Sequence, residues 1–338
     1  MAVQSMTCTD TRDVRATVSQ IRDLENAGCE LVRVAVPDQE AAQALASIKR
    51  GIRLPLIADI HFHHRLALEA IKNGVDGIRI NPGNIGADEI RAVVRAAKDR
   101  DVAIRIGINA GSLERDLSSK YGGPTPEALV ESALKSIALF EAMNFTAIKV
   151  SLKSSDVYTT MAACRRFSAQ SDYPLHLGVT EAGTLVRAAV KSGIGIGALL
   201  SEGIGDTIRV SVTGDPVSEM EIAYGILRAL NIRKVGPDII SCPTCGRCEI
   251  DLFKLVQAVE TELSGMKPYL KIALMGCVVN GPGEAAEADI GIAGGRGSGM
   301  LFKKGRTVRK IREEDFVSEL IEEIRQMLES APSGRPAT

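Results

Sequence analysis

Five short segments of this chain each hold one basic residue between two β-branched residues. They are Val32-Arg33-Val34, Ile78-Arg79-Ile80, Ile104-Arg105-Ile106, Ile148-Lys149-Val150 and Ile208-Arg209-Val210. Each lies in a short apolar run bounded by turn residues, which is typical of a buried strand. A buried cation costs on the order of several kcal/mol unless an anion meets it. Five such strands therefore predict an anionic ligand with several charges, most naturally phosphate or diphosphate.

Polar residues also alternate along these runs, toward the carboxyl end of each. Alternate residues on a strand share a face, which groups Arg33 with Ala35, Asp59 with His61, Arg79 with Asn81, Arg105 with Asn109, Lys149 with Ser151 and Lys153, His176 with Thr180, and Arg209 with Ser211. Asp59 and Glu181 add carboxylates. A salt-bridge network that merely fills the interior is the alternative, but the cations outnumber the carboxylates.

Strands and helices alternate through the first 231 residues, which predicts eight βα units. Short connections and parallel strands favour closure into a (β/α)8 TIM barrel over an open sheet. One helix is expected to end at Ser192, before an apolar glycine-rich stretch. The expected strands are residues 31–36, 56–61, 77–81, 103–109, 147–153, 175–180 and 207–212, with the first around residues 3–6.

Composition fits an enzyme better than a nucleic-acid binder. The 338 residues include 41 basic and 42 acidic side chains, a formal charge of −1, so the cations are local features. The sequence has no run long enough to span a membrane and no signal region at its start, so we expect no membrane partner and a cytoplasmic location. Seven cysteines, an odd number, fit a reducing compartment.

The composition changes after residue 231. We expect a substrate-binding barrel over residues 1–232, a small α+β domain over 239–330 and a disordered tail over 331–338. Four of the seven cysteines fall in the small domain, where spacing alone suggests a four-thiolate site for zinc or an iron–sulfur cluster: Cys242, Cys245, Cys248 and Cys277. Zinc would need a second CxxC or an HxxxH, and neither is present. A redox disulfide between Cys242 and Cys245 is the alternative.

Several longer blocks resemble the bacterial 4-hydroxy-3-methylbut-2-en-1-yl diphosphate synthase family, and the likeness covers nearly the whole chain. The blocks are Val3-Gln4-Ser5-Met6-Thr7, Ala58-Asp59-Ile60-His61-Phe62, Arg79-Ile80-Asn81-Pro82-Gly83-Asn84, Asn109-Ala110-Gly111-Ser112-Leu113, Thr180-Glu181-Ala182-Gly183, Ser201-Glu202-Gly203-Ile204-Gly205-Asp206, Cys242-Pro243-Thr244-Cys245 and Asn280-Gly281-Pro282-Gly283-Glu284.

The resemblance implies reductive opening of 2-C-methyl-D-erythritol 2,4-cyclodiphosphate to a linear allylic diphosphate and water. Two electrons would arrive singly from reduced flavodoxin or ferredoxin through a [4Fe–4S] cluster. By position in the family motifs, the substrate would be held by Arg33, Arg79, Arg105, Asn109, Lys153, Arg209 and Ser211, with Lys149 as a deeper supporting cation. Asp59, His61 and Glu181 match polar active-site positions, and Glu181 is our choice for proton delivery.

The same resemblance revises the ligand set of the cluster. It implies three cysteines and a glutamate, which here are Cys242, Cys245, Cys277 and Glu284, and it makes Cys248 a neighbour. A carboxylate binds a soft iron–sulfur centre less firmly than a thiolate, so one iron could exchange it for substrate. Asn280 would bond substrate or cluster.

Two further expectations complete the sequence-based view. In two-domain members the cluster domain of one subunit is thought to cover the barrel of the other, so we expect a homodimer. The competing interpretation is a phosphate-binding barrel, of the pterin-synthase kind or with an iron–sulfur redox-sensing domain attached. A pterin-synthase-like barrel gives the cysteines of the small domain no role. A redox sensor attached to an inactive barrel does not explain why so many polar residues converge in the barrel.

Overall fold

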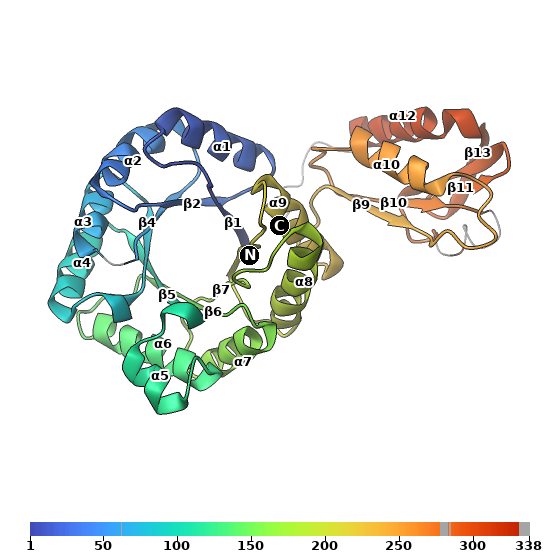
Figure 1. The fold of residues 1–338 in the computed structure, drawn as a ribbon. Helices are drawn as coiled ribbons and strands as arrows, with labels where there is room; N and C mark the ends of the chain where they lie inside the picture. The colour runs from blue at the N-terminus through green and yellow to red at the C-terminus, as the bar shows by residue number, and fades with distance from the viewer. Residues whose placement is uncertain (62, 278–282, 284, 331–338) are drawn as a thin grey trace. The chain divides into compact units, whose positions relative to one another are not determined.

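The computed structural model describes residues 1–61, 63–277, 283 and 285–330. The chain divides into two compact units, Met1–Ile232 and Arg233–Thr338 (Figure 1). Phe62, Asn280, Glu284 and the tail expected at 331–338 lie outside the described residues.

The first unit is the predicted (β/α)8 barrel. All strand pairs are parallel, in the order β6-β5-β4-β3-β2-β1-β8-β7. The ring closes between β6 and β7 through the bridge Val150↔Leu175. The strands are β1 Ala2–Met6, β2 Leu31–Ala35, β3 Leu56–Asp59, β4 Gly77–Ile80, β5 Ala103–Asn109, β6 Ile148–Lys153, β7 His176–Leu177 and β8 Thr207–Ile208.

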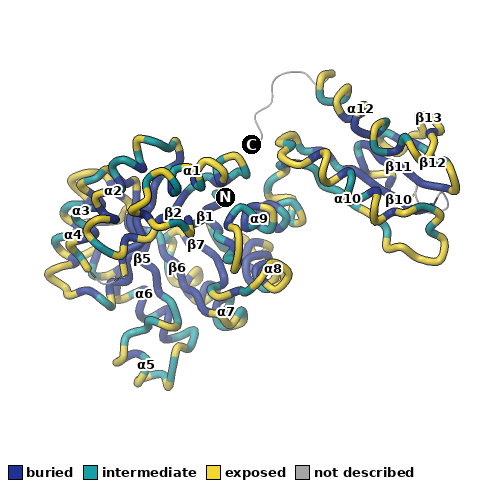
Figure 2. Tube along the Cα trace, turned by 45° about the horizontal axis from the view of Figure 1, so that its top comes forward, coloured by how far each residue is buried: buried dark blue, intermediate teal, exposed yellow. Residues whose placement is uncertain are grey.

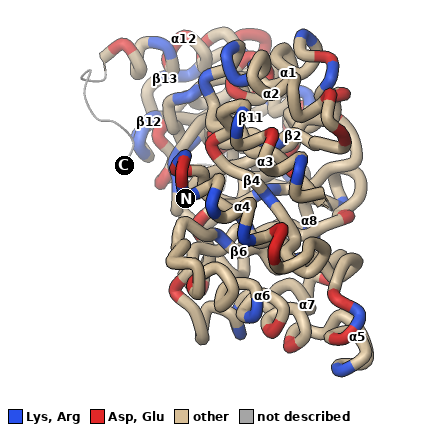
Figure 3. Tube along the Cα trace, turned by 90° about the vertical axis from the view of Figure 1, so that its left-hand side faces the viewer, with Lys and Arg blue, Asp and Glu red and all other residues tan. Residues whose placement is uncertain are grey.

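Helices surround this ring, and their exposed faces point away from the buried strands (Figure 2). Several begin at a side chain that accepts a backbone N–H, such as Asp13, Asp38 and Asp156. Basic and acidic residues are interspersed along the outer helices (Figure 3). The helices are α1 Val14–Asn26, α2 Gln39–Gly51, α3 His64–Lys72, α4 Ala87–Asp99, α5 Arg115–Tyr121, α6 Pro126–Glu141, α7 Val157–Ser168, α8 Leu185–Ser201 and α9 Val217–Ala229.

The structure corrects one expected helix boundary. Helix α8 does not end at Ser192 but continues through the glycine-rich stretch to Ser201. A Cβ at Gly195 would lie 2.7 Å from Val179 Cγ2, so glycine lets the helix pack closely against the barrel. Tertiary packing here overrides the low helix propensity of glycine.

The second unit is a five-stranded sheet in the order β13-β12-β11-β10-β9. Strands β9 to β11 are parallel, whereas β12 and β13 run antiparallel to their neighbours. Two helices pack on one face of the sheet through an aliphatic core that includes Leu255, Ile272 and Leu320. The elements are β9 Pro237–Ser241, α10 Leu252–Glu262, β10 Leu270–Met275, β11 Ile290–Gly295, β12 Ser298–Lys303, β13 Arg306–Arg312 and α12 Phe316–Glu329. No helix among the described residues is long and apolar enough to cross a membrane.

Candidate active site

A cavity of about 90 Å³ in the barrel gathers most of the residues predicted from the alternating strands. Its cations come from five different strand segments, because alternate residues of each strand point inward. The lining residues are Arg33, Asp59, His61, Arg79, Arg105, Asn109, Ser151, Lys153, Val179, Thr180, Arg209 and Ser211.

Strand register explains why charged residues meet in one layer. The pairs Asp59↔Arg79, Arg79↔Arg105 and Arg105↔Lys149 place four charged residues side by side across β3 to β6. Neighbouring residues on adjacent strands lie about 5 Å apart. Three of the four are cations, so this layer carries a local excess of positive charge.

Asp59 lies at the centre of the paired charges. Its carboxylate is 3.3 Å from Nη1 of Arg79 and 3.6 Å from Nε of Arg33. His61 Nε2 lies 3.5 Å from the same carboxylate. Burial alone would raise the pKa of Asp59, but Arg33, His61 and Arg79 together hold it below its usual range. Asp59 is therefore an ionised group that orients two arginines.

The cations of the interior outnumber the carboxylates that face them. Burial, together with neighbouring cations, lowers the pKa of Arg33 to about 10 despite the nearby Asp59 carboxylate, and lowers the pKa of Lys149 to about 8. The pKa values of Arg105 and Lys153 fall well below their ordinary values for the same reasons. Such shifts mean that the charged forms lack solvation. An anionic ligand would supply the missing charge.

Glu219 is a site residue that the sequence analysis missed. It lies on α9, is 1% exposed, and accepts hydrogen bonds from Arg209 Nη2 at 2.9 Å and Ser5 Oγ at 2.7 Å. The period-two pattern of the strands carries no information about a helical residue. The available signal was the surplus of cations, which calls for further buried carboxylates besides Asp59 and Glu181.

Two residues of β1 were also missed. Gln4 Oε1 lies 3.4 Å from Arg105 Nη1, and Met6 Sδ lies 2.9 Å from Arg33 Nη2. Alternation along β1 places both inside the barrel, as it does the cations of the other strands. They lack charge, so they did not stand out.

Two predicted residues do not line the cavity. Lys149 lies deeper in β6, two residues before Ser151. Glu181 is exposed just after the seventh strand, with a backbone φ of 53°. That conformation is uncommon for a residue other than glycine and fixes the direction in which the chain leaves the strand.

The predicted cluster cysteines follow neighbouring strands of the second unit. Cys242 comes directly after β9 and Cys277 shortly after β10, and the register Leu274↔Ser241 places both at the same edge of the sheet. The backbone N–H of Gly276 donates to Cys242 Sγ at 3.3 Å. Cys245 is exposed. Within the described residues, no three metal-binding side chains are close enough to form a site.

Comparison with known proteins follows the division into two units. The family described as the GcpE TIM-barrel domain matches residues 1–224, and the GcpE protein C-terminal domain matches residues 238–326. The chain belongs to the GcpE family. The family barrel thus coincides with the unit that holds the cation-lined cavity.

Similar GcpE proteins share most of their length with this one. The 4-hydroxy-3-methylbut-2-en-1-yl diphosphate synthase (flavodoxin) of Thermodesulfovibrio yellowstonii is 59% identical over 325 residues, which cover 96% of this chain and 93% of that protein. The protein of the same name from Geobacter sulfurreducens is 55% identical over 97% of this chain and 93% of its own length.

Solved structures share the barrel of this GcpE protein at low identity. The dihydropteroate synthase of Stenotrophomonas maltophilia aligns with a TM-score of 0.50 and 15% identity, over 68% of this chain and 92% of that one. This likeness supports the barrel fold alone.

Proposed function

We propose that this protein reductively opens 2-C-methyl-D-erythritol 2,4-cyclodiphosphate to (E)-4-hydroxy-3-methylbut-2-enyl diphosphate in isoprenoid biosynthesis. The reaction takes up two electrons and two protons and releases one water. The observation that carries the proposal is the excess of buried cations around one barrel cavity, which suits a cyclic diphosphate. The names of highly similar relatives give the same activity.

The substrate diphosphate would bind among the inward-facing cations. Arg105 supports this most directly: its Nε is buried and has no hydrogen-bond partner among the described residues. A buried donor without an acceptor is costly, so bound phosphate oxygen would relieve it. Lys149, which lies deeper in β6, would add a supporting positive charge beneath the bound diphosphate. The remaining contacts are assigned to Arg33, Arg79, Asn109, Lys153, Arg209 and Ser211.

Proton handling is assigned to the acidic residues and His61. Asp59 is held ionised between Arg33 and Arg79, which suits orientation of those cations more than proton donation. Glu181 is exposed at the carboxyl end of the barrel strands, where barrel enzymes carry their catalytic groups. We therefore assign proton delivery to Glu181 and a polar contact to Asn280.

A [4Fe–4S] cluster would be held by Cys242, Cys245, Cys277 and Glu284. When bound, it would supply the electrons one at a time. Cys242 and Cys277 share one edge of the sheet, and the backbone N–H of Gly276 donates to the Cys242 sulfur. Both features suit such a group, because hydrogen bonds to sulfur tune these centres. Cys248 is assigned a packing role.

Reduced flavodoxin or ferredoxin is the proposed electron donor, and the relatives' names specify flavodoxin. A cytoplasmic location goes with this proposal, because seven free thiols and an iron–sulfur centre suit a reducing compartment.

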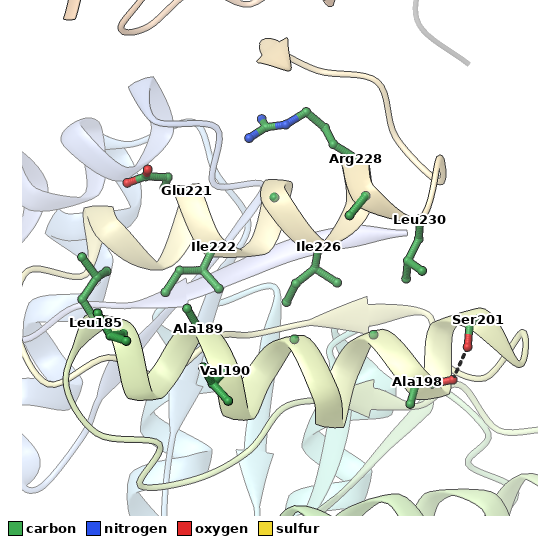
Figure 4. A pocket seen from close by; sticks show the side chains of 15 residues that line it. Leu185, Ala189, Val190, Ala198, Ser201, Glu221, Ile222, Ile226, Arg228 and Leu230 are labelled. Carbon is green, nitrogen blue, oxygen red and sulfur yellow. Dashed lines mark hydrogen bonds between the residues drawn. The ribbon is translucent and has the colours of Figure 1, made fainter. Parts of the chain in front are cut away.

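A homodimer is proposed from an apolar face of the barrel. Three residues of α8 at four-residue spacing are unusually exposed: Val186 at 74%, Val190 at 56% and Ile194 at 54%. Beside them, a groove of about 810 Å³ separates α8 from α9, with Ile222 and Ile226 pointing across it (Figure 4). Contiguous apolar surface of this kind marks interaction sites.

Sedimentation of the double variant Val186→Glu, Val190→Glu tests the homodimer. We expect monomers, whereas Tyr158→Glu, at an equally exposed residue of α7, remains dimeric. A dimeric double variant would exclude this face.

Anaerobic reconstitution with iron and sulfide, followed by Mössbauer and EPR spectroscopy, tests the reaction. We expect a [4Fe–4S] signal with one distinct iron that the cyclodiphosphate perturbs and that Cys277→Ser abolishes. A cluster that ignores the substrate would instead favour a phosphate-binding barrel with a redox-sensing domain. Stoichiometric zinc would exclude the redox chemistry.

A further inference from the structure

The hairpin of β12 and β13 carries the most one-sided charge of the second unit. Residues 303–312 include six basic side chains and no acidic one. Strand β13 is the edge of the sheet, and every cation in it is exposed. Natural proteins use charged side chains to protect edge strands from pairing.

Half of these cations are neutralised within the unit. Arg309 pairs with Glu319 and Glu323 of α12, and Lys303 pairs with Glu323. Arg312 pairs with the acidic turn that follows it. Lys304, Arg306 and Lys310 make no ion pair with any described residue, and they leave the edge with a positive potential that can steer an acidic partner.

Register connects this edge to the cysteines. Lys310 pairs with Met300, Met300 with Ala293, and Ala293 with Met275, which lies two residues before Cys277. Cross-strand partners lie on the same face, so Lys310 shares the face on which Met275, Ala293 and Cys242 pack. Three strand spacings separate Lys310 from β10, or about 14 Å.

An apolar side chain accompanies the cations. The register shift between Leu301 and Phe302 leaves Val308 as an extra residue in β13, and Val308 is 44% exposed. Such a bulge prevents simple strand addition at this edge. A partner would therefore meet a surface of charged side chains around a small apolar contact.

We propose that the β12–β13 edge, centred on Val308 and Lys310, is the docking surface for an acidic one-electron donor protein. The inference rests on the proposed function, since it assumes electron delivery to the cysteine edge. The donor would bind on the side of the sheet opposite α10 and α12 and pass electrons inward across the strands.

Charge reversal at Lys310 tests the docking surface. We expect Lys310→Glu to raise the KM for reduced flavodoxin about tenfold at low salt. The difference should shrink at high salt, where exposed charges are screened. The rate with a small chemical reductant, reduced methyl viologen, should stay at its wild-type value. The control is Lys267→Glu, an equal charge change at an exposed residue before β10, which should leave both rates unchanged.

Direct binding separates failure of docking from failure of the reaction. If the protein converts no cyclodiphosphate with either reductant, the proposed function fails. Titration calorimetry of flavodoxin with the reconstituted full chain still measures docking in that case. Weaker binding of Lys310→Glu than of Lys267→Glu supports the surface. Equal donor KM values and equal affinities for the two variants would overturn it.

Discussion

One carboxylate oxygen of Glu219 lies 2.9 Å from Arg209 Nη2, and the other lies 2.7 Å from Ser5 Oγ. The first contact orients a cation of the candidate site, and the second ties the helix after the last strand to the first strand. A buried helical carboxylate thus positions Arg209 and reinforces the seam between β8 and β1.

Replacing Glu219 by Gln should destabilise the barrel, because it leaves the Arg209 cation without its counter-charge. We expect the free energy of unfolding to fall by about 2 kcal/mol, less than for a fully buried pair, because Arg209 is partly exposed. Urea denaturation measures this. The control Glu202→Gln removes half of an exposed ion pair with Arg165 and should change nothing. Equal midpoints for the two variants would contradict the role of Glu219.

Gly107 makes room for Arg79, which predicts that a single methyl group there disturbs the site. A Cβ at Gly107 would lie 2.2 Å from Arg79 Nε, and Arg79 also donates to the Gly107 carbonyl at 3.0 Å. We expect Gly107→Ala to displace the guanidinium from Asp59 and to weaken diphosphate binding roughly tenfold, the loss of about one charged hydrogen bond.

Titration calorimetry with inorganic diphosphate measures this affinity. The control Gly111→Ala adds the same methyl group where nothing lies within 4 Å, so its affinity should match the wild type. If Gly107→Ala binds diphosphate normally, Arg79 is not a ligand of the anion.

The stability of the ligand-free protein should depend on pH through Lys149. Burial lowers its folded-state pKa to about 8, below the ordinary value for lysine of about 10.4. Between these values the unfolded chain binds more protons than the folded one, so the free energy of unfolding rises with pH in that window. Lys149→Met should remove about 2–3 kcal/mol of that rise.

Urea midpoints at pH 7.5 and 10 measure the effect. Lys98→Met, at an exposed residue of α4, serves as the control and should keep the full rise. Lys153 shifts in the same direction, so part of the rise survives in Lys149→Met. An unchanged slope in Lys149→Met would show that Lys149 is not the titrating group.

Much of this site can be predicted from local sequence, because the alternation of inward- and outward-facing residues along a strand is visible in the sequence. Arg79, Arg105 and Lys153 stand out as cations in aliphatic runs, and alternation assigns them to one face. Glu219 and Gly107 do not stand out in the sequence. The role of Glu219 depends on how α9 packs over the junction of β8 and β1. Gly107 matters because the absence of a side chain there leaves space for Arg79. The glycine-rich half of α8 was missed because helix propensity was weighed without the close packing that favours glycine.

Cys248 provides a last test, since spacing alone makes it equal to its neighbours. Its thiol donates to the Ile250 carbonyl at 3.3 Å and packs against the aliphatic core under α10. A Cβ at Gly276 would lie 2.4 Å from this sulfur, so the chain leaves room for it. Cys248 is therefore engaged in the fold, whereas Cys245 is exposed.

We expect Cys248→Ser to keep a full complement of iron and sulfide after anaerobic reconstitution, and Cys245→Ser to lose most of both. Serine at 248 can retain the hydrogen bond to Ile250, whereas serine at 245 replaces a soft thiolate with a poor iron ligand. Iron and sulfide analysis with the visible absorption spectrum measures this directly. Loss of iron from Cys248→Ser with retention in Cys245→Ser would reverse the ligand assignment and restore Cys248 to the coordinating set.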